Sequence, residues 1–266
     1  MHSPMAAGTG NPATVAQDLQ GRVAVVTGGS SGIGAACVRT LAARGATVVI
    51  GYNRGRQRAE ALCDSLPGDG HRCAHIPLAR DDASDVALAT LAEELTKANG
   101  RVDVLVNSAG FTQRIAHADI ETLTPALFDR TLSANAGGTY AVIRTLMPLL
   151  RESGDAVVVN ISSVSAFTGL GSNVAYCAAK AALDTMTQSL ARAFGHGIRF
   201  LTVSPASVDT DFVAGRNRDE LLAKAEKTPL GRVVTPNDVA SAVIACVTQL
   251  RTATGTRIVI DGGHTL

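Results

Sequence analysis

Short runs rich in β-branched apolar residues alternate along this chain with stretches that have the composition of helices. The strand candidates are Gly21–Val26, Ala46–Ile50, Cys73–Ile76, Val102–Val106, Asp155–Ser163, Ile198–Val203 and Arg257–Ile260. Nearly continuous apolar runs are typical of strands buried on both faces. Strands that alternate with helices pair in parallel through right-handed crossovers. The pattern therefore predicts an α/β fold with a doubly wound parallel sheet in three αβα layers.

The alternation of strands and helices continues without a linker, which favours a single domain over residues 21–266. A hydrophobic fraction of 46% supplies ample material for its core. Residues 1–20 are rich in small and polar types, including Pro4, Gly8, Gly10 and Pro12, and we expect them to form a flexible extension. They lack the basic-then-apolar order of a secretory signal.

Charge and composition exclude several classes of partner. The net charge of +1, the absence of tryptophan and an aromatic fraction of 3% give no reason to expect nucleic acid. No apolar stretch approaches the roughly 20 residues that a membrane span needs. The 5 cysteines show neither metal spacing nor an even count, so we expect reduced thiols and a cytoplasmic protein.

A glycine-rich turn joins the first predicted strand to the first helix. The turn runs from Thr27 to Gly34, and the helix-forming stretch Ala35–Ala43 follows it. Glycines let the backbone approach a pyrophosphate closely, and a helix N-terminus offers free N–H groups to the anion. A glycine cluster between a strand and a helix predicts a Rossmann-type dinucleotide site. Its expected contacts are Gly28, Ser30, Ser31, Gly32, Ile33 and Gly34.

Tyr176 and Lys180 are candidates for catalysis. They stand one helical turn apart, so the ammonium can favour the phenolate form of the tyrosine. Such a pair also occurs by chance on solvated helices. Ser163, however, ends a predicted buried strand, where ligands of open α/β sheets bind. A serine that merely caps the next element is the alternative for Ser163.

The order and spacing of these motifs resemble the short-chain dehydrogenase/reductase family. The matching pieces span nearly the whole chain: the Gly-x-x-x-Gly-x-Gly turn, Asp103–Gly110, Asn135, Ser163, Tyr176 with Lys180, and Ser204–Thr210. Departures from the family pattern are Ser108, Ala206 and Leu78, and Leu78 puts an adenine contact in doubt.

The resemblance implies hydride transfer between a nicotinamide and a carbonyl or secondary alcohol, without a metal. Tyr176 would exchange the proton, Ser163 would bind the substrate oxygen, and Lys180 would lower the pKa of Tyr176 and bind the nicotinamide ribose. Asn135 would hold a water in a proton relay, although a local hydrogen bond within a helix is its alternative. Further implied cofactor contacts are Asn107, Ala109, Gly110, Tyr176, Lys180, Val208 and Thr210. The helical stretches Thr124–Leu150 and Val174–Phe194 would form a homotetramer or homodimer interface.

The end of the second strand bears on which cofactor binds. An acidic side chain there normally binds the ribose 2′-hydroxyl of NAD, but this chain has Tyr52, Asn53 and Arg54, with no acid before Glu60. Arginine suits a 2′-phosphate. NADP(H) is therefore favoured over NAD(H), with Asn53 and Arg54 as predicted contacts. The alternative is that Arg54, Arg56 and Arg58 only begin a solvated helix.

Substrate specificity is expected to lie in a lid around residues 206–229, because such loops vary most. The chain resembles 3-oxoacyl reductases as well as general ketone and sugar-alcohol dehydrogenases, so a small carbonyl or alcohol substrate is expected. Two other classes stay open: a non-catalytic NADP-binding sensor or regulator, and an epimerase of the same fold. Intact Ser163, Tyr176, Lys180 and Asn135 argue against a sensor.

Overall fold

The computed structural model describes residues 16–215 and 217–266. All strands pair in parallel in one 7-stranded sheet with the order β3-β2-β1-β4-β5-β6-β7. The strands are β1 (Val23–Thr27), β2 (Thr47–Tyr52), β3 (Arg72–His75), β4 (Val104–Asn107), β5 (Ala156–Ile161), β6 (Ile198–Pro205) and β7 (Arg257–Ile260). The predicted α/β fold with a doubly wound parallel sheet is confirmed.

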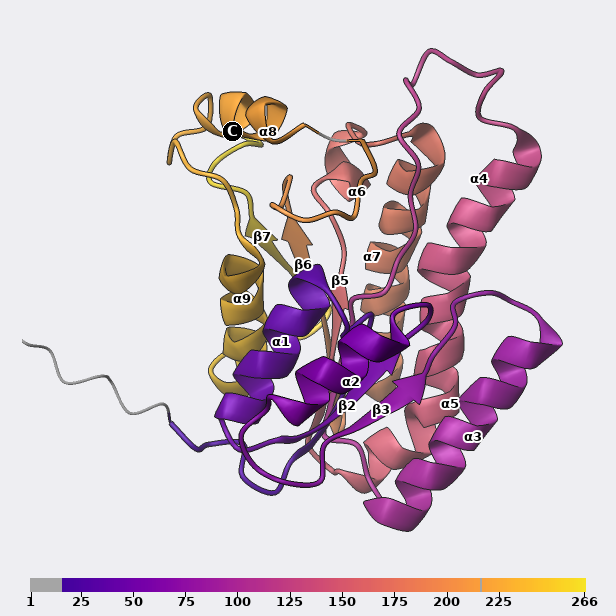
Figure 1. Ribbon diagram of the computed structural model, residues 1–266, viewed down its shortest axis with the longest axis vertical. Helices are drawn as coiled ribbons and strands as arrows, with labels where there is room; N and C mark the ends of the chain where they lie inside the picture. Colours follow the sequence, from indigo (N-terminus) through magenta and orange to yellow (C-terminus); the bar gives the residue numbers. More distant parts are fainter. Residues whose placement is uncertain (1–15, 216) are drawn as a thin grey trace, which may run out of the picture.

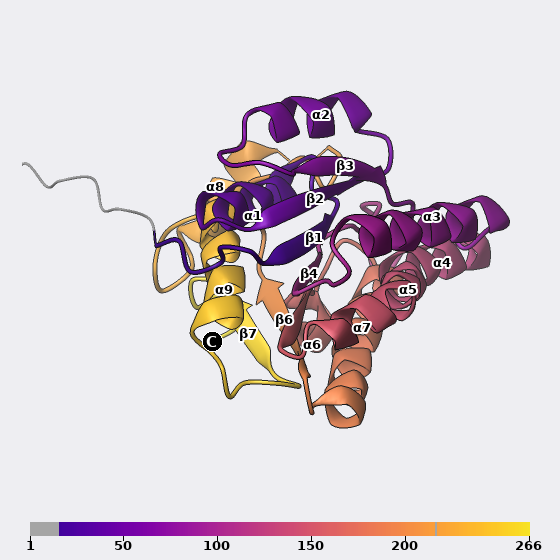
Figure 2. The same ribbon diagram turned by 90° about the horizontal axis from the view of Figure 1, so that it is seen from below.

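Helices cover both faces of the sheet, as Figures 1 and 2 show. They are α1 (Gly32–Ala43), α2 (Arg56–Asp64), α3 (Asp82–Ala98), α4 (Pro125–Leu132), α5 (Gly138–Glu152), α6 (Ser165–Thr168), α7 (Val174–Phe194), α8 (Arg218–Ala225) and α9 (Pro236–Thr248). One apolar cluster joins α1, α2 and α9 to the sheet, and a second joins α3, α5 and α7 to its other face. The chain reverses its strand order between β1 and β4, which places a crevice at the carboxyl ends of the central strands.

Part of the expected N-terminal extension lies against the domain. Residues 1–15 lie outside the described residues. Leu19, in contrast, is buried in the cluster that contains α1, and its backbone N–H donates to the Arg44 carbonyl at 3.0 Å. Asp18 pairs with the Arg44 guanidinium at 2.6 Å. Residues 18 and 19 are thus anchored at the end of α1.

The long helical stretch predicted from Thr124 to Leu150 is not one regular helix. A π-helical turn, η1 (Ser133–Gly137), separates α4 from α5. A π turn accommodates a residue that does not fit the α-helical repeat, and such turns are frequent at functional sites. Residues 133–137 read Ser-Ala-Asn-Ala-Gly and contain no proline that would mark a break in the helix. The predicted helix Val174–Phe194 matches α7.

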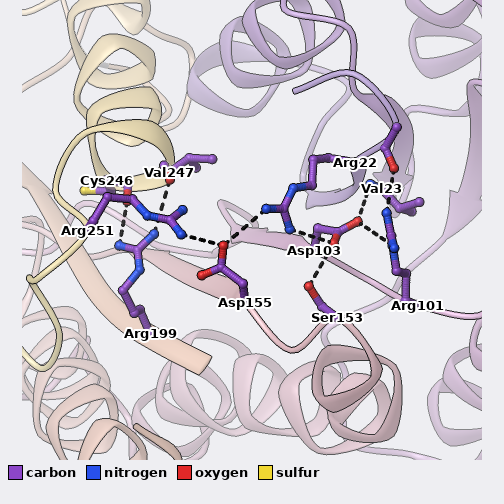
Figure 3. A network of polar contacts seen from close by, with 11 residues as sticks. Arg22, Val23, Arg101, Asp103, Ser153, Asp155, Arg199, Cys246, Val247 and Arg251 are labelled. Atoms are coloured by element: carbon purple, nitrogen blue, oxygen red, sulfur yellow. Dashed lines mark hydrogen bonds and ion pairs between the residues drawn. The ribbon is translucent and has the colours of Figure 1, made fainter. Parts of the chain in front are cut away.

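A network of arginines and aspartates closes the edge of the sheet where the strands begin (Figure 3). Asp103, just before β4, is 1% exposed and accepts hydrogen bonds from Val23 N at 2.8 Å and from Arg22 at 3.0 Å. Asp155, before β5, pairs with Arg22 at 3.2 Å and with Arg251 at 2.5 Å. Despite burial, which acts to raise it, these arginines lower the pKa of Asp155. The network ties the starts of three parallel strands together, away from the crevice.

Within the described ranges, none of the helices combines the length and the apolar character required to cross a membrane. Nor do three or more His, Cys, Asp or Glu side chains of those ranges gather where they could hold a metal ion. All cysteines are free thiols.

Candidate active site

A cavity of about 710 Å³ opens at the carboxyl edge of the sheet. It lies between the ends of β4, β5 and β6, and α8 lies beyond these strand ends (Figure 1). Its walls include residues predicted both for catalysis and for cofactor binding: Ile33, Gly110, Ser163, Tyr176, Lys180, Val208 and Thr210. The structure thus brings together residues from the two ends of the chain.

The glycine turn between β1 and α1 is packed so tightly that side chains would not fit. Gly28 has a φ of +64°, and a Cβ there would lie 2.9 Å from the backbone of Ala109. A Cβ on Gly34 would overlap the carbonyl oxygen of Gly28. Gly32 has a φ of +51° and faces the Thr210 methyl group, 3.2 Å from where a Cβ would be. The segment after β6 therefore lies directly over the glycine turn.

The turn after β4 is tied to the end of β1. The Thr27 hydroxyl accepts hydrogen bonds from the backbone N–H groups of Ser108 and Ala109, both at 3.1 Å. Asn107 donates from Nδ2 to Asn160 Oδ1 at 2.8 Å, whereas its Oδ1 is buried without a hydrogen-bond partner among the described residues. A buried, unpaired acceptor at this edge suits a ligand that can donate to it.

These features fit a dinucleotide. The N-cap of α1, Ser31, makes no side-chain hydrogen bond to the helix, and the first turn contains no acidic residue. The N–H groups at the start of α1 are therefore available to an anion, and the helix dipole favours its charge. With the bare glycine backbone beside them, Gly28, Ser30, Ser31, Gly32, Ile33 and Gly34 form a cradle suited to a pyrophosphate.

At the end of β2 the predicted contacts Asn53 and Arg54 are both exposed and lie outside the cavity lining. Arg58, in the first turn of α2, points back toward the N-cap Gly55. A Cβ on Gly55 would lie 2.7 Å from Arg58 Nη2 and 2.7 Å from the Ser30 hydroxyl. Arg56 differs, because it pairs with Glu60 at 2.8 Å.

The start of α2 has further properties of an anion site. Gly55 provides no side-chain cap, and the first turn contains no acidic residue. Free helix N–H groups, the Arg58 guanidinium and the Ser30 hydroxyl therefore converge beside the glycine turn.

Tyr176 and Lys180 lie on α7 with their side chains near each other. Lys180 Nζ stands 5.6 Å from the centroid of the Tyr176 ring and donates to the Ile161 carbonyl at 2.7 Å. Lys180 is only 4% exposed. Burial lowers the pKa of Lys180 to about 8, while the charge of Asp184, one turn further along α7, acts in the opposite direction. Arg257 holds Asp184 at 2.6 Å.

Ser163 follows the end of β5 and faces the same cavity. It is 8% exposed. Its hydroxyl donates to the hydroxyl of Ser165 at 3.0 Å and accepts from the Ser165 N–H at 3.1 Å. The predicted place of Ser163 at a strand end is confirmed within two positions of β5 (Ala156–Ile161).

Asn135 lies in the π turn η1 and is buried. Its Nδ2 donates to the Phe111 carbonyl at 2.7 Å and to the Thr131 carbonyl at 2.8 Å, and its Oδ1 accepts from Phe111 N at 3.2 Å. The side chain therefore clamps the loop after β4 and is not restricted to a local bond within its helix. With both Nδ2 hydrogens used in these bonds, the side chain could offer a relay water only the remaining lone pair of Oδ1.

Loop segments complete the walls of the cavity. Ile115 N donates to the Ser172 carbonyl at 2.8 Å, and Asn173 Nδ2 donates to the Gln113 carbonyl at 2.6 Å. The Oδ1 atom of Asn173 in turn caps α7 by accepting from Tyr176 N at 2.8 Å. The loop after β4 is thereby fastened to the helix end that holds the tyrosine.

The predicted lid region contains α8 and two contacts across the cavity. Glu220 of α8 pairs with Arg114 at 3.1 Å. The Phe212 ring stands 6.1 Å from the Tyr176 ring, centroid to centroid. Both contacts join the lid region to other residues that line the cavity.

Several residues of this site were not predicted as site residues from the sequence: Arg58, Arg114, Ser165, Asp184, Phe212 and Glu220. Ser165 could have been suspected because it stands two positions after Ser163, where its N–H can reach the hydroxyl. Asp184 could likewise have been suspected, because it follows Lys180 by one helical turn. The remaining residues depend on contacts between distant segments.

Comparison with known proteins gives consistent results. The family model described as enoyl-(acyl carrier protein) reductase matches residues 28–265. The D-threitol dehydrogenase of Mycolicibacterium smegmatis is 35% identical over 253 residues, which cover 93% of this chain and 94% of that protein. The cis-4-hydroxycyclohexanecarboxylate dehydrogenase of Sinomonas cyclohexanicum is 34% identical over 247 residues, 92% of this chain and 96% of that protein. A crystal structure of a dehydrogenase/reductase from Sinorhizobium meliloti matches with a TM-score of 0.82 at 33% identity, and covers 95% of this chain and 98% of that one.

Proposed function

This chain belongs to the short-chain dehydrogenase/reductase family, and we propose that it uses NADPH to reduce a ketone to a secondary alcohol. It is an oxidoreductase of the alcohol dehydrogenase and ketoreductase kind and uses a nicotinamide cofactor. The observation that most directly supports hydride transfer to or from a carbonyl carbon is the convergence of Ser163, Tyr176 and Lys180 on one cavity beside a dinucleotide cradle.

The roles of the residues follow from their chemistry. When bound, the nicotinamide would supply the hydride that the carbonyl carbon accepts. Ser163 would hydrogen-bond the carbonyl oxygen and stabilise its developing charge. Tyr176 would donate the proton to that oxygen as general acid, and would act as general base in the reverse reaction. The Lys180 ammonium would lower the pKa of Tyr176 and bind the nicotinamide ribose.

The preference for NADP(H) is supported by the start of α2. The end of β2 offers no carboxylate that could accept hydrogen bonds from a ribose 2′-hydroxyl, and Arg58 with Ser30 offers donors for a 2′-phosphate. We assign Arg58 the main contact, in addition to the Arg54 contact predicted from the sequence.

The substrate is proposed to be a small polar ketone. The cavity combines apolar walls, such as Val164 and Leu221, with polar groups, such as Ser172 and Thr228. The names of the two dehydrogenase relatives refer to alcohols with further polar groups, threitol and hydroxycyclohexanecarboxylate. A panel of erythrulose, 4-oxocyclohexanecarboxylate and an acetoacetyl thioester would separate a polyol, a carboxylate and a 3-oxoacyl substrate.

The proposal is tested by calorimetric titration with NADPH and NADH, followed by this panel with nicotinamide absorbance as the readout. We expect tighter binding of NADPH and turnover of at least one ketone. Tyr176→Phe should abolish most turnover and preserve cofactor affinity, because the phenol hydroxyl supplies the proton. Binding without turnover on any carbonyl or alcohol would favour a sensor, and product formation without net cofactor oxidation would favour an epimerase.

The cofactor preference has its own test. Arg58→Met should weaken 2′,5′-ADP binding about 10-fold or more and leave 5′-AMP binding unchanged, since only the former has the 2′-phosphate. Arg56→Met is a matched control, because that guanidinium already pairs with Glu60. Arg54→Ala is expected to weaken NADPH more than NADH, by less than Arg58→Met does. Equal losses for both nucleotides would contradict the preference.

A homotetramer or homodimer is also proposed, through α4, α5 and α7. Tyr140 on α5 is exposed, which leaves an aromatic ring on this face available to a partner. Light scattering of the purified protein measures the state directly, and a monomer at micromolar concentration would contradict it.

A further inference from the structure

Ser163 has a second hydroxyl beside it, that of Ser165, the first residue of α6. The two side chains form a closed pair, because Ser163 Oγ donates to Ser165 Oγ at 3.0 Å and accepts from Ser165 N at 3.1 Å. Both residues line the cavity that contains Tyr176. Ser163 is 8% exposed and Ser165 is 6% exposed.

The backbone at Gly171 packs against the Ser165 hydroxyl. A Cβ on Gly171 would stand 2.8 Å from Ser165 Oγ and 2.9 Å from Cys177 Sγ. The backbone after α6 therefore closes onto the hydroxyl, and Gly171 leaves it the necessary space. The bond from Ser165 N–H to the Ser163 hydroxyl is a local turn in which a serine accepts from the backbone two residues later, and it fixes the direction of Ser163 Oγ.

The hydrogen count of the pair decides what Ser165 can do. A hydroxyl has one hydrogen to donate and two lone pairs that accept. In this structure Ser163 Oγ donates its one hydrogen to Ser165 Oγ. In the described ranges, Ser165 Oγ has Ser163 as its one hydrogen-bond partner and accepts in that bond. The hydroxyl hydrogen of Ser165 therefore makes no hydrogen bond there.

A substrate oxygen changes this arrangement. To hold a carbonyl oxygen, Ser163 must direct its hydrogen toward that oxygen. Ser165 Oγ then loses the bond that it accepted and can rotate its own hydrogen onto the free lone pair of Ser163. The bond between the two hydroxyls reverses, no heavy atom has to move, and each remaining donor keeps an acceptor. Chains of hydrogen bonds that point one way strengthen one another.

We propose that Ser165 is a positioning residue that donates to Ser163 when substrate is bound and so aligns and strengthens the hydrogen bond from Ser163 to the reacting oxygen. The inference rests on the proposed function, since it assumes that Ser163 binds that oxygen. Ser165 acts through Ser163 and needs no contact of its own with the substrate.

The test is a double-mutant cycle with Ser163→Ala, Ser165→Ala and the double variant, assayed on the best ketone of the panel with saturating NADPH. Ser165→Ala keeps the backbone N–H and removes only the hydroxyl. It should lower kcat about 3- to 10-fold with little change in KM, the effect of one neutral hydrogen bond that matters mainly in the transition state. Ser163→Ala should lower kcat about 100-fold or more.

The decisive comparison is made in the Ser163→Ala background. There, adding Ser165→Ala should change kcat less than about 1.5-fold, because the residue through which Ser165 acts is gone. Thr168→Val is the matched control, since it also removes a hydroxyl from α6. That hydroxyl donates to the Val164 carbonyl at 2.9 Å and accepts from Leu170 N at 3.2 Å, and it makes no bond to Ser163. Its kcat should equal that of the parent enzyme, and NADPH affinity should be unchanged in Ser165→Ala.

The outcomes separate this inference from the proposed function. Wild-type kcat in Ser165→Ala, or the same fold loss with and without Ser163, would overturn the positioning role. An equal kcat loss in Thr168→Val would assign the effect to α6 stability and overturn it as well. If Ser163→Ala itself retains near-parental kcat, the proposed function fails at its oxygen-binding step.

Discussion

Replacing Asp103 by asparagine should destabilise the protein and leave the residues of its active site unchanged. Asp103 is 1% exposed, and each of its carboxylate oxygens accepts two hydrogen bonds (Figure 3). Oδ1 receives Arg22 at 3.0 Å and Ser153 at 2.8 Å, and Oδ2 receives Val23 N at 2.8 Å and Arg101 at 3.2 Å. An amide retains one accepting oxygen, so two donors would face an NH₂ group.

The size of the effect follows from these donors. Losing hydrogen bonds to a charged acceptor costs about 1.5–3 kcal/mol, and a buried N–H left unpaired costs about 1–3 kcal/mol. Arg22 and Arg101 are partly exposed, so their guanidinium groups can bond to water instead. The total cost therefore lies near the lower end of the range obtained by adding these two costs. We expect a loss of about 3 kcal/mol in the free energy of unfolding, or roughly 6–10 °C in Tm.

Asp155→Asn is the matched control in the same network. Its carboxylate is 39% exposed and pairs with Arg22 and Arg251, and exposed ion pairs contribute about 1 kcal/mol or less. Urea unfolding followed by far-UV circular dichroism suits a chain without tryptophan. The measurement is repeated at several protein concentrations so that subunit dissociation is recognised. A loss below about 1 kcal/mol for Asp103→Asn, or one equal to that of Asp155→Asn, would refute the reasoning.

Three further outcomes are expected. Gly34→Ala should weaken NADPH binding by calorimetry at least about 10-fold, since its Cβ would overlap the Gly28 carbonyl; unchanged affinity would mean that the turn does not hold the pyrophosphate. For ketone reduction, kcat/KM should fall as pH rises through about 8, because burial lowers the pKa of Lys180 to about 8. Asp184→Asn should move this fall to lower pH, because the variant loses a charge that favours the ammonium form of Lys180. Superimposable pH profiles of the two proteins would contradict this expectation. Arg114→Gln should raise the substrate KM about 2- to 3-fold at low salt and less at high salt, because the ion pair that closes the cavity is exposed and screened, and a salt-independent effect would exclude that cause.

The central part of the fold was predictable because its signals are local. Apolar runs of β-branched residues marked the strands, and the helix Val174–Phe194 was predicted with the bounds of α7. The glycine turn was equally predictable from the sequence, since only glycine permits the close approach between Gly28 and Ala109. In the same way, the spacing of Tyr176 and Lys180 on a helix predicts that their side chains lie close together.

What the sequence did not reveal depends on contacts between distant segments. Arg54, Arg56 and Arg58 look alike in sequence, and only the fold shows Arg56 paired with Glu60 and Arg58 beside Ser30. The π turn that divides the predicted helix 124–150 contains Asn135, whose hydrogen-bond partner Phe111 stands 24 positions away in the chain. Strand ends also shifted by one or two residues, as at β4, because tertiary pairing and not residue type decides where a strand begins.

The π turn at residues 133–137 has a consequence for evolution and engineering. It contains one residue more than the α-helical turn it replaces. Deleting that residue would give a continuous, locally more regular helix, yet it would rotate everything before the deletion by about 100° relative to α5. The amide of Asn135 would then leave the backbone of Phe111, and the loop after β4 would lose its anchor. The extra residue therefore sets the rotation of α4 relative to α5 about the helix axis. Deleting or inserting one residue here should destabilise the site far more than a substitution would.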